Sequence, residues 1–394
     1  MKKIAMFLER DFPPDPRVEN EALSLIEAGH NVYLFCITYD NEHLLVEEYK
    51  NIKVYRYSGN KLIYKLSALA YTFPFYRWLI SSKIKHFIGA IQPDVLHVHD
   101  MVLAEAVMRV NKKRLPVLLD LHENRPAIME YYNHTKKFPG NILINLKKWH
   151  SKQLELIYNS DKVIVVTQEA ADHYVSLTNM NLGDFIVVPN TVNLESFRGF
   201  PIDRSILERF NAGFNLVYVG DTGLRRGTLT AIEAVYRLKD AIPNIQLILV
   251  GKSSQDYILK GRVKELGIEK HVFFEGWQDL SLFPSYIKAA DICLSPILRN
   301  LHHDTTYANK IFQYMAMEKP VIVSDCPPQV RVIEESNCGL VFKADDEDDL
   351  TSKILYLNRN PEERLTMGKS GFETGRQKWN WAKSQKDLVH FYKQ

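Results

Sequence analysis

Cationic, amide and hydroxyl side chains gather just before an apolar helical pattern in residues 302–325. The apolar residues at positions 311, 312, 314, 315 and 316 predict a helix over residues 307–317. Three residues of types that favour helix N-caps place its start near residue 306: Asp304, Thr305 and Thr306. The free N–H groups of that helix end, together with Lys310, would suit a phosphate. The alternative is an ordinary capped helix with a solvated lysine.

A glycine loop with two arginines follows an apolar strand pattern at residues 215–219. Gly220 ends the strand, Arg225 and Arg226 lie in the loop, and a helical pattern follows. A strand, a glycine loop and a helix start can together bind a diphosphate, and arginine presents a planar fork to phosphate oxygens. We therefore predict that Arg226 and Lys310 clamp a phosphate. The alternative is a pair of surface arginines in an ordinary loop.

Polar residues also stand at the ends of four further strand patterns. Lys252 and Trp277 follow two of them in the C-terminal half. In the N-terminal half, two neighbouring patterns end in His-acid pairs, His99-Asp100 and His122-Glu123. Ligands collect at the carboxyl ends of parallel strands, so we expect binding and catalytic groups at these tips. The alternative for any one histidine is a structural residue with satisfied hydrogen bonds.

The first sixty residues predict a strand, a helix and a second strand. The helix has Asp15 and Pro16 as a plausible N-cap and first residue, and Arg17 lies in its first turn. The connecting loop holds no G-x-G-x-x-G fingerprint, which disfavours a dinucleotide enzyme. Arg17 is a candidate contact for donor phosphates, and a solvated arginine is the alternative.

Residues 62–87 are rich in aromatic and basic side chains. Such a segment can lie at a membrane interface. It can equally form a pair of helices, split at Pro74, that faces the core. Both alternatives remain open on the sequence alone.

Composition indicates a globular chain of two domains. The 394 residues are 46% hydrophobic and 25% charged, and 50 basic against 47 acidic residues disfavour nucleic-acid binding. The four cysteines form no C-x-x-C pair, which favours buried thiols over disulfides or zinc. The acidic run at residues 345–349 indicates a solvated turn, so no metal site is predicted. No signal-peptide pattern and no long apolar run occur, so we expect a cytoplasmic protein.

Three segments carry a resemblance to a known family: KIFQYMAMEKPVIVSDCPPQV from Lys310, VVPNTVN at residues 187–193, and the strand and loop at residues 219–227. They resemble the retaining glycosyltransferases of family four, also called group 1. The resemblance implies an α/β chain of the GT-B type, with two Rossmann-like, doubly wound domains facing an interdomain cleft. It implies an acceptor-binding domain at residues 1–193, a nucleotide-sugar domain at 194–375, and a helix at 376–394 that crosses back to the first domain.

The resemblance also implies roles for individual residues. His122 would lie beside the donor sugar as a catalytic residue, and Trp277 would contact the nucleobase unless it only packs. The family has glutamates where this chain has Thr305 and Gln313. Gln313 can still hydrogen-bond a ribose hydroxyl, and Asp304 is a possible stand-in beside Thr305. Thr306 and Asn309 complete the expected donor-binding set.

The implied reaction is a retaining, metal-independent hexosyl transfer (EC 2.4) from a nucleotide-diphosphate sugar, UDP rather than GDP, with no other cofactor. The acceptor would be a hydroxyl of a lipid-linked or growing surface glycan, at the inner face of the membrane and with peripheral membrane contact through the N-terminal domain. Arg226, Lys310 and the helix dipole would do the work of Mg²⁺. The alternatives are a sugar-nucleotide epimerase of the same fold and a catalytically silent partner subunit.

Overall fold

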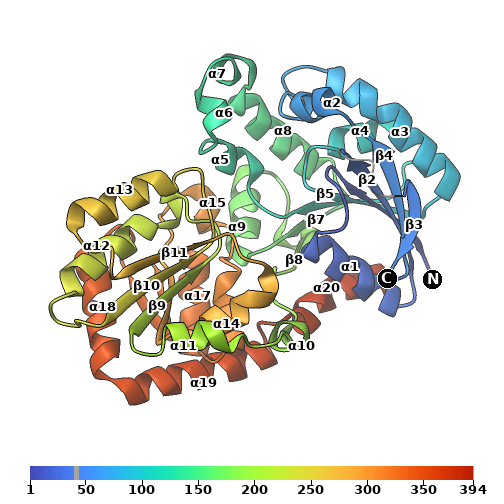
Figure 1. Cartoon of the computed structure of the whole chain (residues 1–394). Helices are drawn as coiled ribbons and strands as arrows, with labels where there is room; N and C mark the ends of the chain where they lie inside the picture. The colour runs from blue at the N-terminus through green and yellow to red at the C-terminus, as the bar shows by residue number, and fades with distance from the viewer. Residues whose placement is uncertain (40–43, 394) are drawn as a thin grey trace. The chain divides into compact units, whose positions relative to one another are not determined.

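The computed structural model describes residues 1–39 and 44–393, and its chain divides into two compact units (Figure 1). Unit 1 comprises Met1–Pro189 and Gln385–Gln394. Unit 2 comprises Asn190–Ser384. The division after Pro189 falls close to the expected division after residue 193, and the returning segment begins at Gln385 rather than at residue 376.

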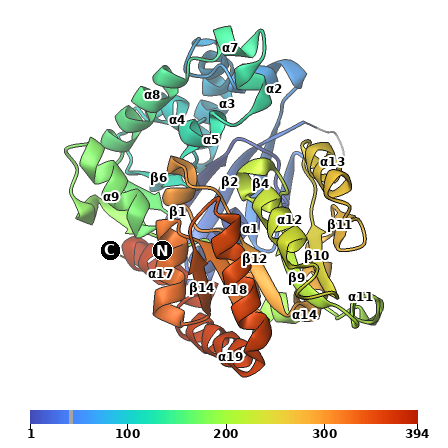
Figure 2. The same ribbon diagram turned by 90° about the vertical axis from the view of Figure 1, so that its left-hand side faces the viewer.

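Unit 1 is built on a sheet with the strand order β3-β4-β2-β1-β5-β6-β7-β8, of which Figure 2 labels β1, β2, β4 and β6. Its neighbouring strands are parallel, except for the antiparallel pair β3 and β4. The strands are β1 (Lys3–Leu8), β2 (Asn31–Thr38), β3 (Val46–Tyr49), β4 (Ile52–Ser58), β5 (Val95–His99), β6 (Val117–Leu121), β7 (Lys162–Val165) and β8 (Phe185–Val187). Of these, β3 was not predicted, because its pattern is half exposed.

The helices that connect these strands begin at residues that satisfy their free N–H groups. Asp15 caps α1 by accepting from the N–H of Val18 at 3.1 Å, with Pro16 first in the helix as predicted. The helices are α1 (Pro16–Glu27), α2 (Lys61–Ser67), α3 (Phe75–Ile91), α4 (Ala104–Val110), α5 (Arg125–Met129), α6 (Asn133–Lys136), α7 (Gly140–Leu143), α8 (Leu146–Tyr158), α9 (Gln168–Leu177) and the 3-10 turn η1 (Leu182–Asp184).

The two faces of this sheet differ in chemistry because side chains alternate along each strand. One face is apolar, with Leu96 and Val98 of β5 packed in a cluster that includes residues of α3, α4 and α8. The intervening residues of β5, His97 and His99, therefore point to the opposite face. Asp120 of β6 is paired in register with His99. This second face thus buries polar groups side by side.

Unit 2 is built on a parallel sheet with the strand order β11-β10-β9-β12-β13-β14. Alternate residues of β9 enter separate apolar clusters, with Val217 and Val219 on one face and Leu216 and Tyr218 on the other. Because both faces are covered, the strands have continuous apolar sequences. They are β9 (Phe214–Val219), β10 (Ile245–Val250), β11 (Val272–Gly276), β12 (Ile292–Ser295), β13 (Val321–Ser324) and β14 (Gly339–Phe342).

Helices cover both faces of this second sheet. The helices and 3-10 turns of residues 194–393 are α10 (Leu194–Arg198), α11 (Arg204–Arg209), η2 (Leu224–Arg226), α12 (Thr228–Leu238), α13 (Asp256–Leu266), η3 (Leu280–Leu282), α14 (Phe283–Ala289), α15 (Leu301–Asp304), α16 (Lys310–Ala316), α17 (Pro327–Ser336), α18 (Glu347–Arg359), α19 (Pro361–Gln377) and α20 (Trp381–Lys393). The end of α20 belongs to unit 1, where the hydroxyl of Tyr392 lies 3.0 Å from Nδ1 of His97. All four cysteines are free and buried, as predicted.

Two glycines allow very close backbone contacts at the ends of β9 and β10. A Cβ on Gly227 would lie 1.7 Å from the carbonyl oxygen of Pro296, and one on Gly251 would lie 1.8 Å from that of Gly220. Both glycines have positive φ angles, +68° and +152°. The loops that follow β9 and β10 are therefore fixed against their neighbours.

The predicted helix start near residue 306 is wrong, because α16 begins at Lys310. Residues 301–304 form the short helix α15, which Asn300 caps by accepting from the N–H of His303 at 3.0 Å. Asp304 instead receives two hydrogen bonds from Arg299, at 2.7 and 3.1 Å. The hydroxyl of Thr305 donates to the carbonyl of Leu301 at 2.7 Å. Asp304 and Thr305 thus form their hydrogen bonds in the turn before α16.

Residues 62–87 form α2 and α3, separated near Pro74 as one alternative predicted. One side of α3 lies in the apolar core, with Tyr76 and Ile80 buried. Its other side is exposed, as Trp78 is 61% accessible. Among the described residues, no helix combines the length and hydrophobicity that crossing a membrane requires.

Candidate functional site

Lys310 lies beneath the loop that follows β9 in unit 2. Its Nζ atom is 3.4 Å from the centroid of the Tyr218 ring, and the side chain is buried. The same atom is 3.5 Å from the place where a Cβ on Gly220 would stand. Gly220 therefore leaves room for the ammonium group at the carboxyl end of the central strand. This is the place where open parallel sheets bind their ligands.

Arg225 and Arg226 lie in the same loop and share two partners. Their guanidinium groups lie 3.2 and 3.4 Å from Oδ2 of Asp221. An NH1 atom of each also approaches Nε2 of His303, at 3.3 and 3.4 Å. Two arginines therefore converge on one carboxylate and one imidazole. We call Gly220, Arg225, Arg226, His303 and Lys310 the cation cluster.

His303 has a defined tautomer within this cluster. Burial and the charge of Arg226 lower the pKa of His303 to about 3, so the imidazole is neutral near pH 7. Its Nδ1 atom is 2.7 Å from the carbonyl oxygen of Leu298, to which it donates. Nε2 is left to accept from the arginines. His303 was not among the predicted site residues. Its only signal in the sequence is the His-His pair that precedes the residues predicted to bind phosphate.

The cation cluster carries more positive than negative charge. Burial, and next the charge of Arg226, lower the pKa of Lys310 well below its ordinary value. Asp221 supplies one negative charge against the two arginines, and Lys310 adds a further positive charge when it is protonated. A buried site with surplus cations is stabilised by an anion, and guanidinium groups and ammonium ions are the usual partners of phosphate. The structure thus brings together Gly220, Arg225, Arg226 and Lys310, as the sequence suggested.

The remaining predicted donor-binding residues of unit 2 differ in exposure. Trp277 is 73% exposed, so the alternative of simple packing is wrong. Lys252 and Asn309 are also exposed, Thr306 and Gln313 are half-buried, and Thr305 is buried. Asp304, the expected stand-in for a glutamate, is paired with Arg299.

His122 of unit 1 follows β6 and is charged. Its Nε2 atom lies 2.8 Å from Oδ2 of Asp120, and its Nδ1 atom lies 3.9 Å from Oδ2 of Asp100. Burial by itself would lower the pKa of His122, but the charges of Asp120 and Asp100 outweigh it and raise the pKa to about 9. The imidazolium is thus the main form at neutral pH. A cation at a sheet edge could contact an anionic or hydroxyl-bearing ligand.

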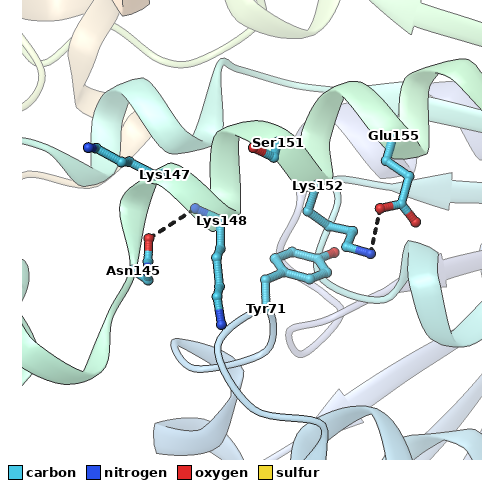
Figure 3. Close-up of a pocket in the computed structure, with 7 residues that line it drawn as sticks. All are labelled: Tyr71, Asn145, Lys147, Lys148, Ser151, Lys152 and Glu155. Atoms are coloured by element: carbon cyan, nitrogen blue, oxygen red, sulfur yellow. Dashed lines mark hydrogen bonds and ion pairs between the residues drawn. The ribbon is translucent and has the colours of Figure 1, made fainter.

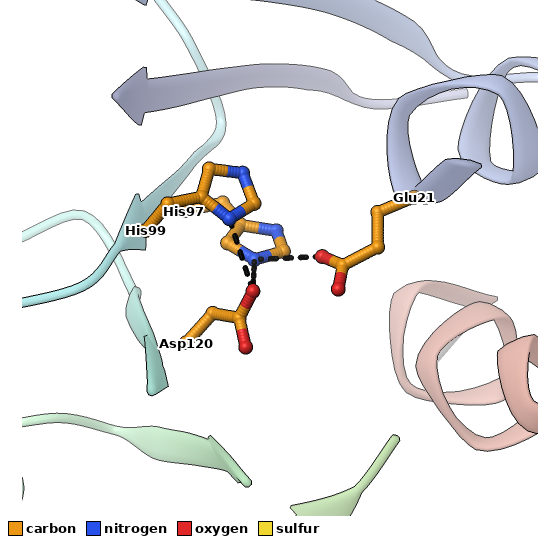
Figure 4. A group of neighbouring side chains, drawn as sticks. All are labelled: Glu21, His97, His99 and Asp120. Carbon is orange, nitrogen blue, oxygen red and sulfur yellow. Dashed lines mark hydrogen bonds and ion pairs between the residues drawn. The ribbon is translucent and has the colours of Figure 1, made fainter. Parts of the chain in front are cut away.

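A buried polar network lies behind His122 and contains Glu21, His97, His99 and Asp120 (Figure 4). Nδ1 of His99 is 3.0 Å from Oδ2 of Asp120, and Nε2 of His97 is 3.5 Å from Oε2 of Glu21. Burial and the charge of His97 lower the pKa of His99 to about 4. Burial and the charge of Asp120 raise the pKa of Glu21 to about 8.

Arg17 completes this network, and both predictions made for it are wrong. It is neither solvated nor turned towards a ligand, because it is only 4% exposed. Its NH2 atom pairs with Asp120 at 2.8 Å and with Glu21 at 3.0 Å, and NH1 donates to the carbonyl of Val188 at 3.0 Å. Glu21 lies one helical turn after Arg17, so α1 presents both groups to the same face of the sheet.

The network offers four metal-ligating side chains whose donor atoms lie within 4.8 Å of one another. Arg17 already pairs with both of its carboxylates. Arg17 therefore supplies the positive charge that a metal ion would otherwise bring to Glu21 and Asp120. We interpret the group as a buried ion network that holds His122 and the strand ends in place.

Two family models match the chain in succession. Residues 17–196 match the model described as Glycosyltransferase Family 4, and residues 200–374 match the model described as Glycosyl transferases group 1. The Bacillus subtilis (strain 168) protein EpsD, described as a glycosyltransferase, is 25% identical over 206 residues, or 51% of this chain. These residues are 52% of EpsD, so the match spans about half the length of that relative.

A longer match is to the phosphatidyl-myo-inositol mannosyltransferase of Mycobacterium leprae. It is 21% identical over 318 residues, which are 79% of this chain and 76% of the mannosyltransferase. Among solved structures, sucrose-phosphate synthase from Thermosynechococcus elongatus superposes with a TM-score of 0.79 at 19% identity, covering 100% of this chain and 98% of the synthase. Anabaena Alr3699/HepE in complex with UDP-glucose gives a TM-score of 0.72 at 15% identity, over 100% of both chains.

Proposed function

Since this chain belongs to glycosyltransferase family four, the group 1 glycosyltransferases, and has the GT-B fold, we propose that it transfers a hexosyl group from a nucleotide-diphosphate sugar to a hydroxyl acceptor. The observation that carries the proposal is the cation cluster at the carboxyl end of β9. Arg225, Arg226 and Lys310 would hold the diphosphate of the donor. Trp277 would offer an exposed ring to the nucleobase.

Departure of the nucleoside diphosphate is the difficult step of such a reaction. Negative charge builds on the diphosphate as the anomeric carbon gains oxocarbenium character. Fixed cations lower this barrier because they bind the leaving group more tightly in the transition state than in the ground state. In our proposal Arg226 and Lys310 provide this charge without a metal ion or other cofactor, and the reaction retains the anomeric configuration. His122 is the proposed catalytic residue of unit 1.

The proposed donor is a UDP-sugar. Alr3699/HepE, a protein of similar fold, has been crystallised with UDP-glucose, and this supports UDP over GDP. The donor-binding set of the proposal further includes Lys252, Thr305, Thr306, Asn309 and Gln313. A set of UDP- and GDP-sugars tested for thermal stabilisation would identify the base, because a ligand that binds only the native state raises the melting temperature.

The proposed acceptor is a lipid-linked or growing surface glycan at the inner face of a membrane, and the enzyme would work from the cytoplasm. The name of the mycobacterial relative, a phosphatidyl-myo-inositol mannosyltransferase, supports a lipid acceptor. Incubation of the enzyme with the UDP-sugar alone provides a control. An epimer as product would assign the chain to the alternative epimerase class, whereas transfer to an added acceptor supports our proposal.

The decisive variant is Lys310→Met, which keeps the buried volume of the side chain and removes its charge. We expect kcat to fall about 10²–10³-fold while the KM for the donor changes less, because the charge acts mainly on the developing diphosphate. Lys319→Met is the matched control, since Lys319 is a half-buried lysine of unit 2 that donates to the carbonyl of Ala290 at 2.7 Å. An unchanged kcat in Lys310→Met would contradict the proposed role.

A further inference from the structure

One end of unit 1 exposes an unusual number of large apolar side chains. Figures 1 and 2 both place α2 and α7 close together at this end, with α8 beside them. The N–H of Asn145, which precedes α8, donates to the hydroxyl of Thr72 at 3.3 Å. This hydrogen bond joins the start of α8 to the segment between α2 and α3. We call this region the aromatic–lysine surface. Its exposed apolar residues are Leu62, Tyr64, Phe73, Phe75, Trp78, Phe138, Ile142 and Leu143.

The exposed aromatic residues of α3 contact one another rather than the core. Phe75 stacks on Phe73 with a centroid distance of 6.1 Å and meets Trp78 edge-on at 5.8 Å. On the α7 side, Phe138 is 81% exposed. A monomeric protein rarely leaves so many large apolar groups in water without a partner. Tyrosine and tryptophan are also the residues enriched where membranes meet water.

The charge of this surface is mainly positive. Residues 61–79 and 130–155 contain eight lysines and arginines against two acidic residues, Glu130 and Glu155, although the whole chain has a net charge of only +3. The remaining sequence is therefore acidic on balance, and the positive charge is concentrated on the side that carries the exposed aromatic rings. A polybasic surface of this kind attracts anionic lipid headgroups, at about 1 kcal/mol for each lysine or arginine near the membrane.

A cavity of about 310 Å³ opens on this surface at the start of α8 (Figure 3). It is lined by Tyr71, Asn145, Lys147, Lys148, Ser151, Lys152 and Glu155. Tyr71 is a rigid part of the lining, because its hydroxyl donates to the carbonyl of Met101 and its ring meets that of Trp149 edge-on at 4.7 Å.

The lysines of this cavity are not equivalent. Lys152 is paired with Glu155 at 2.7 Å and approaches Glu105 at 3.5 Å. Lys147 and Lys148 are exposed, and neither ammonium group has an ion-pair partner within the described part of the chain. Lys148 extends beside Tyr71 and Lys147 points away from it (Figure 3), so the two ammonium groups can attract separate phosphates of neighbouring lipid headgroups.

We propose that the aromatic–lysine surface docks unit 1 on a bilayer that contains anionic phospholipid. A headgroup phosphate binds Lys148 beside Tyr71 in the cavity, and Lys147 contacts a neighbouring headgroup, while Phe75, Trp78 and Phe138 enter the interface between headgroups and acyl chains. This inference rests on the proposed function in one respect: access to a lipid-linked acceptor is the reason for the membrane contact. Docking itself needs neither the sugar donor nor turnover.

The test is co-sedimentation with vesicles of phosphatidylglycerol and phosphatidylcholine, compared with vesicles of pure phosphatidylcholine, across a range of salt concentrations. The wild-type protein should bind the anionic vesicles, and added salt should weaken this binding. The double variant Lys147→Glu/Lys148→Glu should reduce the partition coefficient at least about tenfold. The double variant Phe75→Ser/Trp78→Ser should reduce it similarly.

Matched controls separate the surface from general effects of charge or hydrophobicity. Lys112→Glu/Lys113→Glu reverses two adjacent exposed lysines before β6, and Tyr158→Ser removes an exposed ring at the other end of α8. Both should bind vesicles like the wild type, and thermal unfolding confirms that every variant is folded. Three outcomes would each overturn the inference. The wild type could bind pure phosphatidylcholine vesicles as well as anionic ones, or the control variants could lose as much vesicle binding as the test variants. The protein could also bind free glycerol phosphate but no vesicles. Sugar transfer to a water-soluble acceptor would continue in that case, so the proposed function would stand.

Discussion

Nε2 of His122 lies 2.8 Å from Oδ2 of Asp120, the same oxygen that His99 contacts at 3.0 Å. One carboxylate oxygen thus faces two imidazoles in opposite states of charge, because the pKa of His122 is raised to about 9 and that of His99 is lowered to about 4. The other oxygen of Asp120 accepts from Arg17 at 2.8 Å. Asp120 is therefore the main cause of the positive charge on His122, whereas His99 stays neutral because burial and His97 outweigh Asp120.

Asp120→Asn should remove the positive charge from His122 at neutral pH. Burial alone lowers the pKa of this histidine, so without the Asp120 charge its pKa should fall from about 9 to 6.5 or below. NMR titration of the His122 ring would measure the change. Asp100→Asn is the milder control, because Asp100 is 3.9 Å from His122 and its positive φ angle suits asparagine. A larger effect from Asp100→Asn would contradict this assignment.

The same substitution should also destabilise unit 1. Arg17 would keep its buried charge and lose its closest partner, at a cost of about 3–5 kcal/mol for a broken buried pair. Denaturant unfolding of Asp120→Asn and of Arg17→Met would compare the two sides of the pair. Donor affinity in Arg17→Met should remain that of the wild type, since this arginine has no exposed atoms to offer a ligand. A loss of donor affinity without a loss of stability would support the prediction that Arg17 contacts the donor phosphates.

Stability should pass through a maximum near neutral pH. The pKa of folded His122 is raised to about 9. Its contribution to the free energy of unfolding is therefore complete below pH 6.5 and is lost as the pH rises to 9. The pKa of Glu21 is raised to about 8, so its contribution is likewise lost as the pH rises. His99 has a lowered pKa of about 4, so its contribution is lost as the pH falls from 6.5 to 4. Urea unfolding at pH 5, 7 and 9 would measure both slopes, and His122→Gln should flatten the alkaline slope.

Binding of a nucleoside diphosphate should draw a proton onto Lys310. Burial and Arg226 hold the pKa of this lysine well below its ordinary value, and the charge of a bound diphosphate would raise it again. Calorimetry with UDP in buffers of different ionisation enthalpy counts the protons taken up. We expect proton uptake by the wild type and none by Lys310→Met. Identical buffer dependence in the two proteins would show that Lys310 does not change its protonation state on binding, which would contradict this prediction.

Gly227→Ala should distort the loop that follows β9 and so destabilise unit 2. An added Cβ would lie 1.7 Å from the carbonyl oxygen of Pro296, in addition to the strain of the +68° φ angle. Gly267→Ala is a matched control, because Gly267 has a φ angle of +64° and no atom within 4 Å of the added Cβ. We expect a loss of about 1–2 kcal/mol for Gly267→Ala and a clearly larger one for Gly227→Ala, measured by urea unfolding.

The strands of both units could be predicted from sequence because each is short, apolar and buried. β9 and β10 are examples, with every residue of β9 buried and a glycine just after each strand. Their order then places Lys310 near Gly220, which is why the cation cluster was largely foreseen. The exposed antiparallel strand β3 lacked that continuous apolar signal and was missed.

The errors concern interactions between distant residues. Arg17 resembles a free arginine locally, and its partner Asp120 lies more than one hundred positions along the chain. The start of α16 was misplaced because Arg299 binds the carboxylate of Asp304 and the hydroxyl of Thr305 donates to the carbonyl of Leu301. His303 was not selected because its role depends on two arginines from another loop. Local patterns locate strands and turns, whereas such pairings appear only once the sheet is assembled.

The division of the chain has a consequence for the order of its synthesis. Residues 1–189 leave the ribosome before unit 2, whereas Leu388 and Tyr392, both buried in the finished protein, leave it after unit 2. Unit 2 is continuous and can complete its core while translation continues. The part of unit 1 that precedes unit 2 must wait for α20 before His97 meets Tyr392.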